Sequence, residues 1–172
     1  MPGLPVLGSI ANSSTVENIG FNFPLEACKG DTVTFTYTGT GTNAGTYDWS
    51  GTNDVNIINS GRGPILAAWD SVGTQSFTLE VSENGCSSTI VDDIIIHGLP
   101  EVELVTDALN DSICEDQEIT FTALPDSFVT FAFYNLDSIV LQDSPSNEFI
   151  TSTLDPNNDI SVFAVDSNQC ES

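Results

Sequence analysis

Apolar and polar residues alternate along much of the chain, which is the pattern of β-strands with one buried face. In residues 33–37, 77–81 and 119–123 every second residue is apolar, and threonine fills most of the positions between. Stretches rich in Gly, Asn, Asp and Ser separate these runs, for example residues 39–46 and 154–159, and their chemistry favours turns. Because no segment has a helical period, the pattern predicts an all-β sandwich fold.

The chain repeats itself once, and the repeat predicts its domain organisation. Each half also opens on Gly-Leu-Pro, at residues 3–5 and 98–100. The sequence therefore predicts two tandem immunoglobulin-like β-sandwich domains, residues 1–97 and residues 98–172. The matching segments are CKGDTVTFT (28–36) with CEDQEITFT (114–122), TYDWS (46–50) with TFAFY (130–134), and FTLEVSENGC (77–86) with SVFAVDSNQC (161–170).

The two halves differ after their final cysteine. Cys86 is followed by STIVDDIIIHG, a run rich in β-branched residues, whereas only Glu171 and Ser172 follow Cys170. We expect the second sandwich to lack its last strand and the chain to be a piece of a longer array, whose neighbouring repeats would be its first partners.

The charge balance narrows the classes of partner. The 172 residues include 25 acidic side chains against Lys29 and Arg62, a net charge of -23. So acidic a surface repels phosphates, which argues against nucleic acid and against anionic membranes. No apolar run is long enough to insert into a bilayer. An acidic chain rich in Thr, Ser, Asn and Gly favours an extracellular location.

Four cysteines are the strongest candidates for covalent chemistry. No two of them have the Cys-x-x-Cys spacing, and the chain has a single histidine, so a zinc site has poor support. The repeat selects two structural disulfides, Cys28–Cys86 and Cys114–Cys170, which imply an oxidising compartment. If each first cysteine opens one strand and each second cysteine follows another, however, the pairs lie at opposite ends of a sandwich, and the thiols stay free.

No catalytic constellation is visible, and we expect no enzyme activity. Trp49 lies in an alternating strand and is expected to be the core aromatic of the first sandwich rather than a sugar platform. Trp69 is expected to pack in the core or at its rim. His97, the only histidine, lies at the predicted domain boundary with no nucleophile to assist.

Calcium is the one cofactor that the sequence suggests, and no other cofactor is expected. Asp155 to Asp159 begins like a calcium loop and Asp166 follows at the twelfth position, but Ile160 stands where such loops require glycine. A hairpin turn is therefore the preferred reading. Acidic clusters at 92–93 and 107–118 are further candidates near the domain junction, although solvated acidic loops are the more common case.

The motifs of both halves resemble a known class of repeats. CKGDTVTF, YDW, NSGRGPILAAW and DSVGTQSFTLEV resemble PKD-like domains of large secreted proteins of Bacteroidota. CEDQEITFTA, FAFYN and VFAVDSNQC look like the Ig-like repeats that accompany them. The resemblance implies a place in long cell-surface adhesins, including gliding-motility proteins exported by type IX secretion, in which such sandwiches act as stalk or adhesive modules.

The leading hypothesis is therefore a non-enzymatic extracellular repeat of an adhesin-like surface protein. The alternative is an accessory carbohydrate-binding module of a secreted polysaccharide hydrolase, which two or three coplanar exposed aromatic rings would support. A third is a calcium-tuned interaction module. Surface glycans or other extracellular proteins are the partners that these hypotheses share.

Overall fold

The computed structural model describes residues 18–108, 114, 116–154 and 159–172. All regular structure in these residues is β-strand, which confirms the predicted fold class. The chain divides into two compact units, Met1–Ile96 and His97–Ser172. Among the described residues there is no helix with the length and apolar character needed to cross a membrane.

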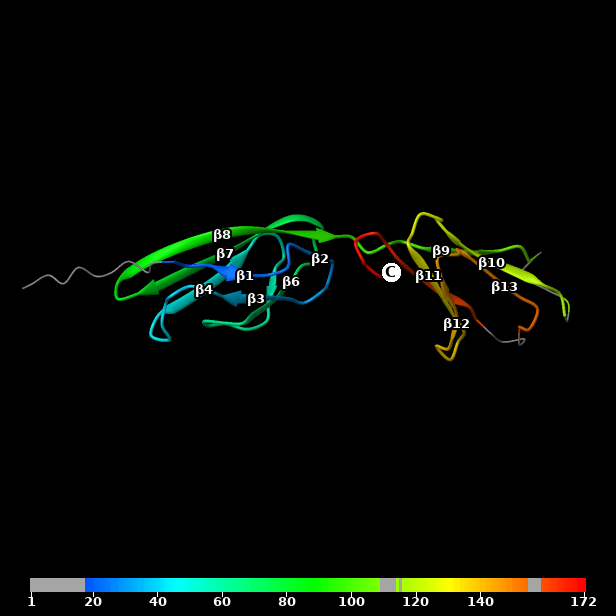
Figure 1. Ribbon diagram of the computed structural model, residues 1–172, viewed down its shortest axis with the longest axis horizontal. Helices are drawn as coiled ribbons and strands as arrows, with labels where there is room; N and C mark the ends of the chain where they lie inside the picture. The colour runs from blue at the N-terminus through cyan, green and yellow to red at the C-terminus, as the bar shows by residue number, and fades with distance from the viewer. Residues whose placement is uncertain (1–17, 109–113, 115, 155–158) are drawn as a thin grey trace, which may run out of the picture. The chain divides into compact units, whose positions relative to one another are not determined.

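The first unit consists of two four-stranded sheets (Figure 1). One has the order β1-β3-β6-β5 and the other β2-β8-β7-β4. β7 pairs along its whole length with β8 as an antiparallel hairpin, from Gly73 opposite Ile96 to Glu83 opposite Cys86. The strands are β1 (Phe21–Asn22), β2 (Glu26–Cys28), β3 (Val33–Tyr37), β4 (Thr46–Gly51), β5 (Asn56–Ile57), β6 (Ile65–Ala68), β7 (Gly73–Glu83) and β8 (Cys86–His97).

An aromatic cluster fills the space between these sheets. Phe77 of β7 is fully buried, and its ring centroid lies 4.0 Å from that of Phe35 and 5.6 Å from that of Trp49. The alternation read from the sequence puts these rings inside, because successive side chains of a strand point to opposite faces. Rings at such separations gain packing energy beyond the burial of their apolar surface.

One polar side chain is buried beside this cluster. Gln75 is 1% exposed, and its Oε1 accepts hydrogen bonds from Thr52 Oγ1 and Asn53 Nδ2. Its Nε2 donates to the carbonyl oxygens of Ser71 and Val72. Every polar atom of the amide therefore has a hydrogen-bond partner. Gln75 links the loop after β4 to the loop before β7 without leaving a buried polar group unpaired.

The second unit has two three-stranded sheets, with the orders β13-β10-β9 and β12-β11-β14. Fully buried Ala123, Phe131, Phe133 and Ala164 form the centre of its core. Two of these four are alanines, so aromatic rings supply most of the buried volume. The strands are β9 (Glu103–Thr106), β10 (Ile119–Leu124), β11 (Thr130–Tyr134), β12 (Val140–Ser144), β13 (Glu148–Thr151) and β14 (Ser161–Val165).

The sequence repeat corresponds to equivalent strands. The aligned segments form β3 and β10, β4 and β11, and β7 and β14. In the first unit β7 pairs with β4, and in the second unit the equivalent β14 pairs with β11. β8 covers the far edge of β7. On the edge of β14 that faces away from β11, the described residues form only an isolated bridge, Val165 with Glu171.

The cysteine pairing differs from the one that the repeat predicted. Cys28 and Cys170 are each disulfide-bonded, whereas Cys114 is an exposed free thiol. The predicted Cys114–Cys170 bond is therefore wrong. The end of β10 leads by a short loop to Thr130, which pairs with Val165 at the end of β14. Cys170 follows that end of β14, whereas Cys114 precedes the other end of β10. The two cysteines therefore lie at opposite ends of the second unit.

The predicted Cys28–Cys86 bond is wrong for a similar reason. β2 lies beside β8, and the carbonyl of Leu25 accepts a hydrogen bond from the amide of Ile95. Cys86 begins β8, nine positions before Ile95, and nine strand residues span roughly 30 Å. Cys28 is only three residues from Leu25, so the two sulfurs are much too far apart for a bond that needs Cα atoms about 6 Å apart.

The bonded and free cysteines of the structure predict a labelling pattern. In the folded, unreduced protein an alkylating reagent is expected to modify Cys114, and to modify Cys28 and Cys170 only after reduction and unfolding. Peptide mass mapping reads out each site, and the Cys114→Ser variant should lose its label without a change in unfolding midpoint. Recovery of a peptide that joins Cys114 to Cys170 would contradict the corrected pairing.

Candidate functional site

Both tryptophans lie in the core of the first unit. Trp49 is 7% exposed and Trp69 is 1% exposed. The indole Nε1 of Trp49 donates to the carbonyl of Gly61, and that of Trp69 donates to the carbonyl of Thr52. Their polar atoms thus bond within the unit, and neither ring offers a face to a sugar.

The second unit carries an aromatic pair on an outer sheet face. Phe163 of β14 is 40% exposed, and its ring centroid lies 5.4 Å from that of half-buried Tyr134 on β11. The ring planes meet at 88°. Perpendicular rings do not make the coplanar platform that is expected of a carbohydrate-binding module.

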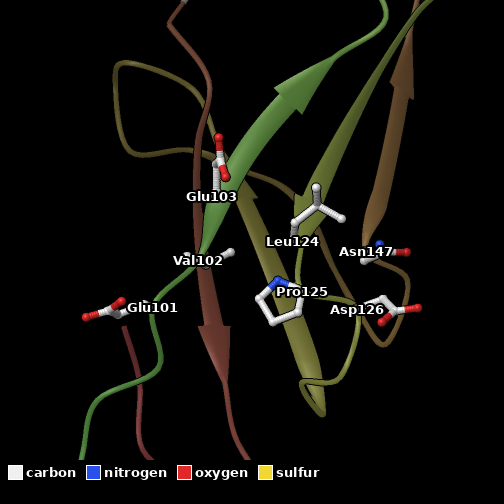
Figure 2. A pocket seen from close by; sticks show the side chains of 7 residues that line it. All are labelled: Glu101, Val102, Glu103, Leu124, Pro125, Asp126 and Asn147. Atoms are coloured by element: carbon white, nitrogen blue, oxygen red, sulfur yellow. The ribbon is translucent and has the colours of Figure 1, made fainter.

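A shallow groove of about 760 Å³ lies at one end of the second unit (Figure 2). Its walls combine three carboxylates with apolar side chains. Figure 2 shows the carboxylates of Glu101 and Asp126 directed away from each other, with that of Glu103 directed along a third line. They do not converge on a common point. The lining residues are Glu101, Val102, Glu103, Leu124, Pro125, Asp126 and Asn147.

The acidic clusters at 92–93 and 107–118 are described only in part, because residues 109–113 and 115 lie outside the described residues. Within the described ranges no group of three or more His, Cys, Asp or Glu side chains is placed to hold a metal ion. Asp93 accepts a hydrogen bond from the hydroxyl of Ser76, and Asp107 accepts one from the amide of Thr120. Residues 155–158 of the candidate loop lie outside the described residues, so the hairpin turn there stays a prediction.

Asp166 has a structural role in the turn after β14. Its Oδ1 accepts hydrogen bonds from the amides of Asn168 and Cys170 at 2.8 and 2.9 Å. Partial burial alone would raise the pKa of the Asp166 carboxyl, but these backbone hydrogen bonds, a bond from the Asn168 side chain and the charge of His97 outweigh it. The net result is that the pKa of Asp166 is lowered.

The lowered pKa predicts an acid-dependent stability. A carboxylate with a depressed folded-state pKa stabilises the fold fully above the ordinary Asp pKa of about 3.9. That stabilisation is lost as pH falls through the lower folded-state pKa. We expect Asp166→Asn to lower the urea midpoint at pH 5–7 and the difference from wild type to shrink below about pH 4. Ser167→Ala, in the same turn, is the control, and a difference that does not change with pH would contradict this role.

A second, smaller cleft in the first unit surrounds one of the two basic side chains. It has a volume of about 160 Å³ and lies between the loop after β3 and the loop before β6. Arg62 Nε donates to the carbonyl of Gly41 at 3.1 Å, and its guanidinium carbon lies 5.3 Å from the ring centroid of Tyr37. Thr36, Asn43, Gly63 and Pro64 complete the lining.

Tyr47 interacts with Tyr37 and Arg62 of this cleft and forms one cluster with them. Its hydroxyl donates to the carbonyl of Thr42 at 2.8 Å. Partial burial and the neighbouring Tyr37 raise the pKa of Tyr47, while a hydrogen bond with Arg62 acts in the opposite direction. This cluster could not be predicted from the sequence, since Gly41, Tyr47 and Arg62 come from three segments that only the fold brings together.

Comparison with known proteins assigns no family. No protein-family model matches the chain, and no curated protein matches it. Several solved structures are similar to it at low identity. Fibronectin(III)-like modules of Clostridium thermocellum CbhA are 16% identical, with a TM-score of 0.43 and coverage of 90% of this chain and 89% of theirs.

Two further structures come from bacterial proteins. The surface protein SGBP-B of the Bacteroides ovatus mixed-linkage glucan utilization locus, in complex with a mixed-linkage heptasaccharide, is 11% identical with a TM-score of 0.37. The alignment covers 97% of this chain and 43% of that one. The Yersinia pseudotuberculosis adhesin InvE is 17% identical with a TM-score of 0.31, over 90% of this chain and 58% of that one. Scores and identities this low transfer no function.

Proposed function

We propose that this chain is a non-enzymatic, extracellular module of a long cell-surface protein, in which it acts as a spacer. The observation that carries the proposal is that two β-sandwich units follow one another along the sequence of one acidic chain, each with its own aromatic core. A unit that buries its own core does not depend on a ligand or a partner chain for its fold. Units of this kind can be repeated along a chain to build a stalk.

Two chemical features support the extracellular part of the proposal. Cys28 and Cys170 are each disulfide-bonded, and structural disulfides persist mainly in oxidising compartments. The net charge of -23 keeps a long chain soluble and repels other copies of itself. On the sequence motifs quoted above, we further propose that the parent protein is an adhesin of Bacteroidota exported by type IX secretion.

The location is tested on intact cells that produce the parent protein. An antibody against the folded chain is expected to bind cells before permeabilisation, and added protease is expected to remove that signal. A cytoplasmic protein processed in parallel is the control for leakage. Signal that appears only after permeabilisation would overturn the proposal.

The spacer role is tested by stretching the chain between two handles in a force spectrometer. Two unfolding events are expected under reducing conditions, one for each unit, because each core must break separately. A single event, or extension at negligible force, would contradict the proposal of a spacer that resists pulling.

A further inference from the structure

The cleft around Arg62 differs in charge from the rest of the molecule. The chain has 25 acidic residues, yet none of the six residues that line this cleft is acidic. One of the two basic side chains lies there instead. The cleft therefore presents a positive charge on an otherwise repulsive surface. The Glu83 carboxylate, whose charge acts on Tyr47, accepts hydrogen bonds from the amide and the hydroxyl of Thr42.

The guanidinium of Arg62 is held in place by neutral groups. The Gly41 carbonyl, the Tyr37 ring and the Tyr47 hydroxyl fix its orientation. A guanidinium has more N–H donors than the Gly41 carbonyl and the Tyr47 hydroxyl use. It keeps its full charge under all ordinary conditions and binds carboxylates through paired hydrogen bonds.

The other walls of the cleft suit an uncharged polar ligand group. Thr36 supplies a hydroxyl from β3, and Asn43 supplies a side-chain amide from the following loop. Gly63 has a φ of +104°, which L side chains rarely adopt, so no side chain grows from the wall next to Arg62. The cleft is below the size of a typical drug-like pocket and suits one small ring.

We propose that this cleft binds a sugar unit that carries a single carboxylate, of the uronate class, within an otherwise neutral glycan. Arg62 pairs with the carboxylate, while Thr36 and Asn43 hydrogen-bond the ring hydroxyls. A single guanidinium balances one carboxylate. A run of carboxylates, as in an acidic peptide or a polyuronate, is repelled by the net charge of -23. The site gives the proposed surface module an adhesive function that spacing alone does not require.

The experiment is an NMR titration of the isotope-labelled whole chain with three small probes. Methyl glucuronide carries both the ring and the carboxylate, methyl glucoside carries only the ring, and acetate carries only the carboxylate. Methyl glucuronide is expected to shift the amide signals of residues 41–43 and 61–63 saturably, with an affinity roughly tenfold or more above either partial probe.

Variants separate the site from the fold. Thr36→Val and Asn43→Ala leave the contacts that hold Arg62 in place and are expected to weaken methyl glucuronide binding several-fold. Thr34→Val, on the same strand outside the cleft, is the matched control and should bind as wild type. Arg62→Lys keeps the charge but loses the planar fork, so binding is expected to disappear while signal dispersion shows that the unit is folded.

Three results would overturn the proposal. The first is acetate binding as tightly as methyl glucuronide, which means a simple anion site. The second is tighter binding of an aspartate-rich peptide, which means a protein partner. The third is no saturable shift with any probe. None of these bears on the cell-surface labelling or the force measurement, so the spacer proposal stands or falls separately.

Discussion

Phe77→Ala is expected to lower the free energy of unfolding of the first unit by about 3–5 kcal/mol, the cost of removing a fully buried aromatic ring from a packed core. The Phe77 ring is 0% exposed and lies within 6.1 Å, centroid to centroid, of four other rings. Because β-strands of both sheets hold Phe21, Phe35 and Trp49, the cavity cannot close without moving backbone.

Denaturant unfolding followed by tryptophan fluorescence measures this effect, since Trp49 and Trp69 are the chain's only tryptophans and both lie in the first unit. Val91→Ala is the matched control, because Val91 is 56% exposed on the neighbouring strand β8. Its change is expected to stay within about 0.5 kcal/mol. A Phe77→Ala loss no larger than that of the control would mean that the rings are not packed as described.

Phe133→Ala is expected to unfold most of the second unit at room temperature. Phe133 is fully buried, with its ring centroid 5.7 Å from that of Phe149, and among the described residues four buried side chains form the centre of this core. A loss of about 3–5 kcal/mol approaches the whole stability of a small domain. Small domains have a low free energy of unfolding because they bury a smaller share of their surface than large domains do.

Circular dichroism and NMR dispersion of the second unit's signals measure the second effect. Leu136→Ala is the control, because Leu136 is 63% exposed in the same unit. Well-dispersed signals from β10, β11 and β14 in Phe133→Ala, with an unchanged unfolding midpoint, would contradict the described core.

The strands that the sequence predicted best are those whose burial alternates. Phe77 and Leu79 are buried and Glu80 is exposed, as the period of two requires. Strand equivalence between the two units could also be predicted, because each repeated segment carries its own buried positions. Local pattern therefore determined the fold class.

The cysteine pairing could not be predicted in the same way. Sequence symmetry selected partners by their position in the repeat, whereas a disulfide depends on distance in space. Cys86 and Cys28 are far apart because β8 is long and meets β2 near its other end. The cleft around Arg62 was missed for the same reason, since its contacts join residues distant in sequence.

The central claim is that each unit folds around its own core, and hydrogen exchange of the whole Phe77→Ala protein tests it most directly. Under reducing conditions, exchange is expected to accelerate in the amides of β3, β6 and β7 while those of β10, β11 and β14 keep their wild-type rates. Acceleration of equal size in both units would contradict the claim, because it would mean that one shared core stabilises the chain.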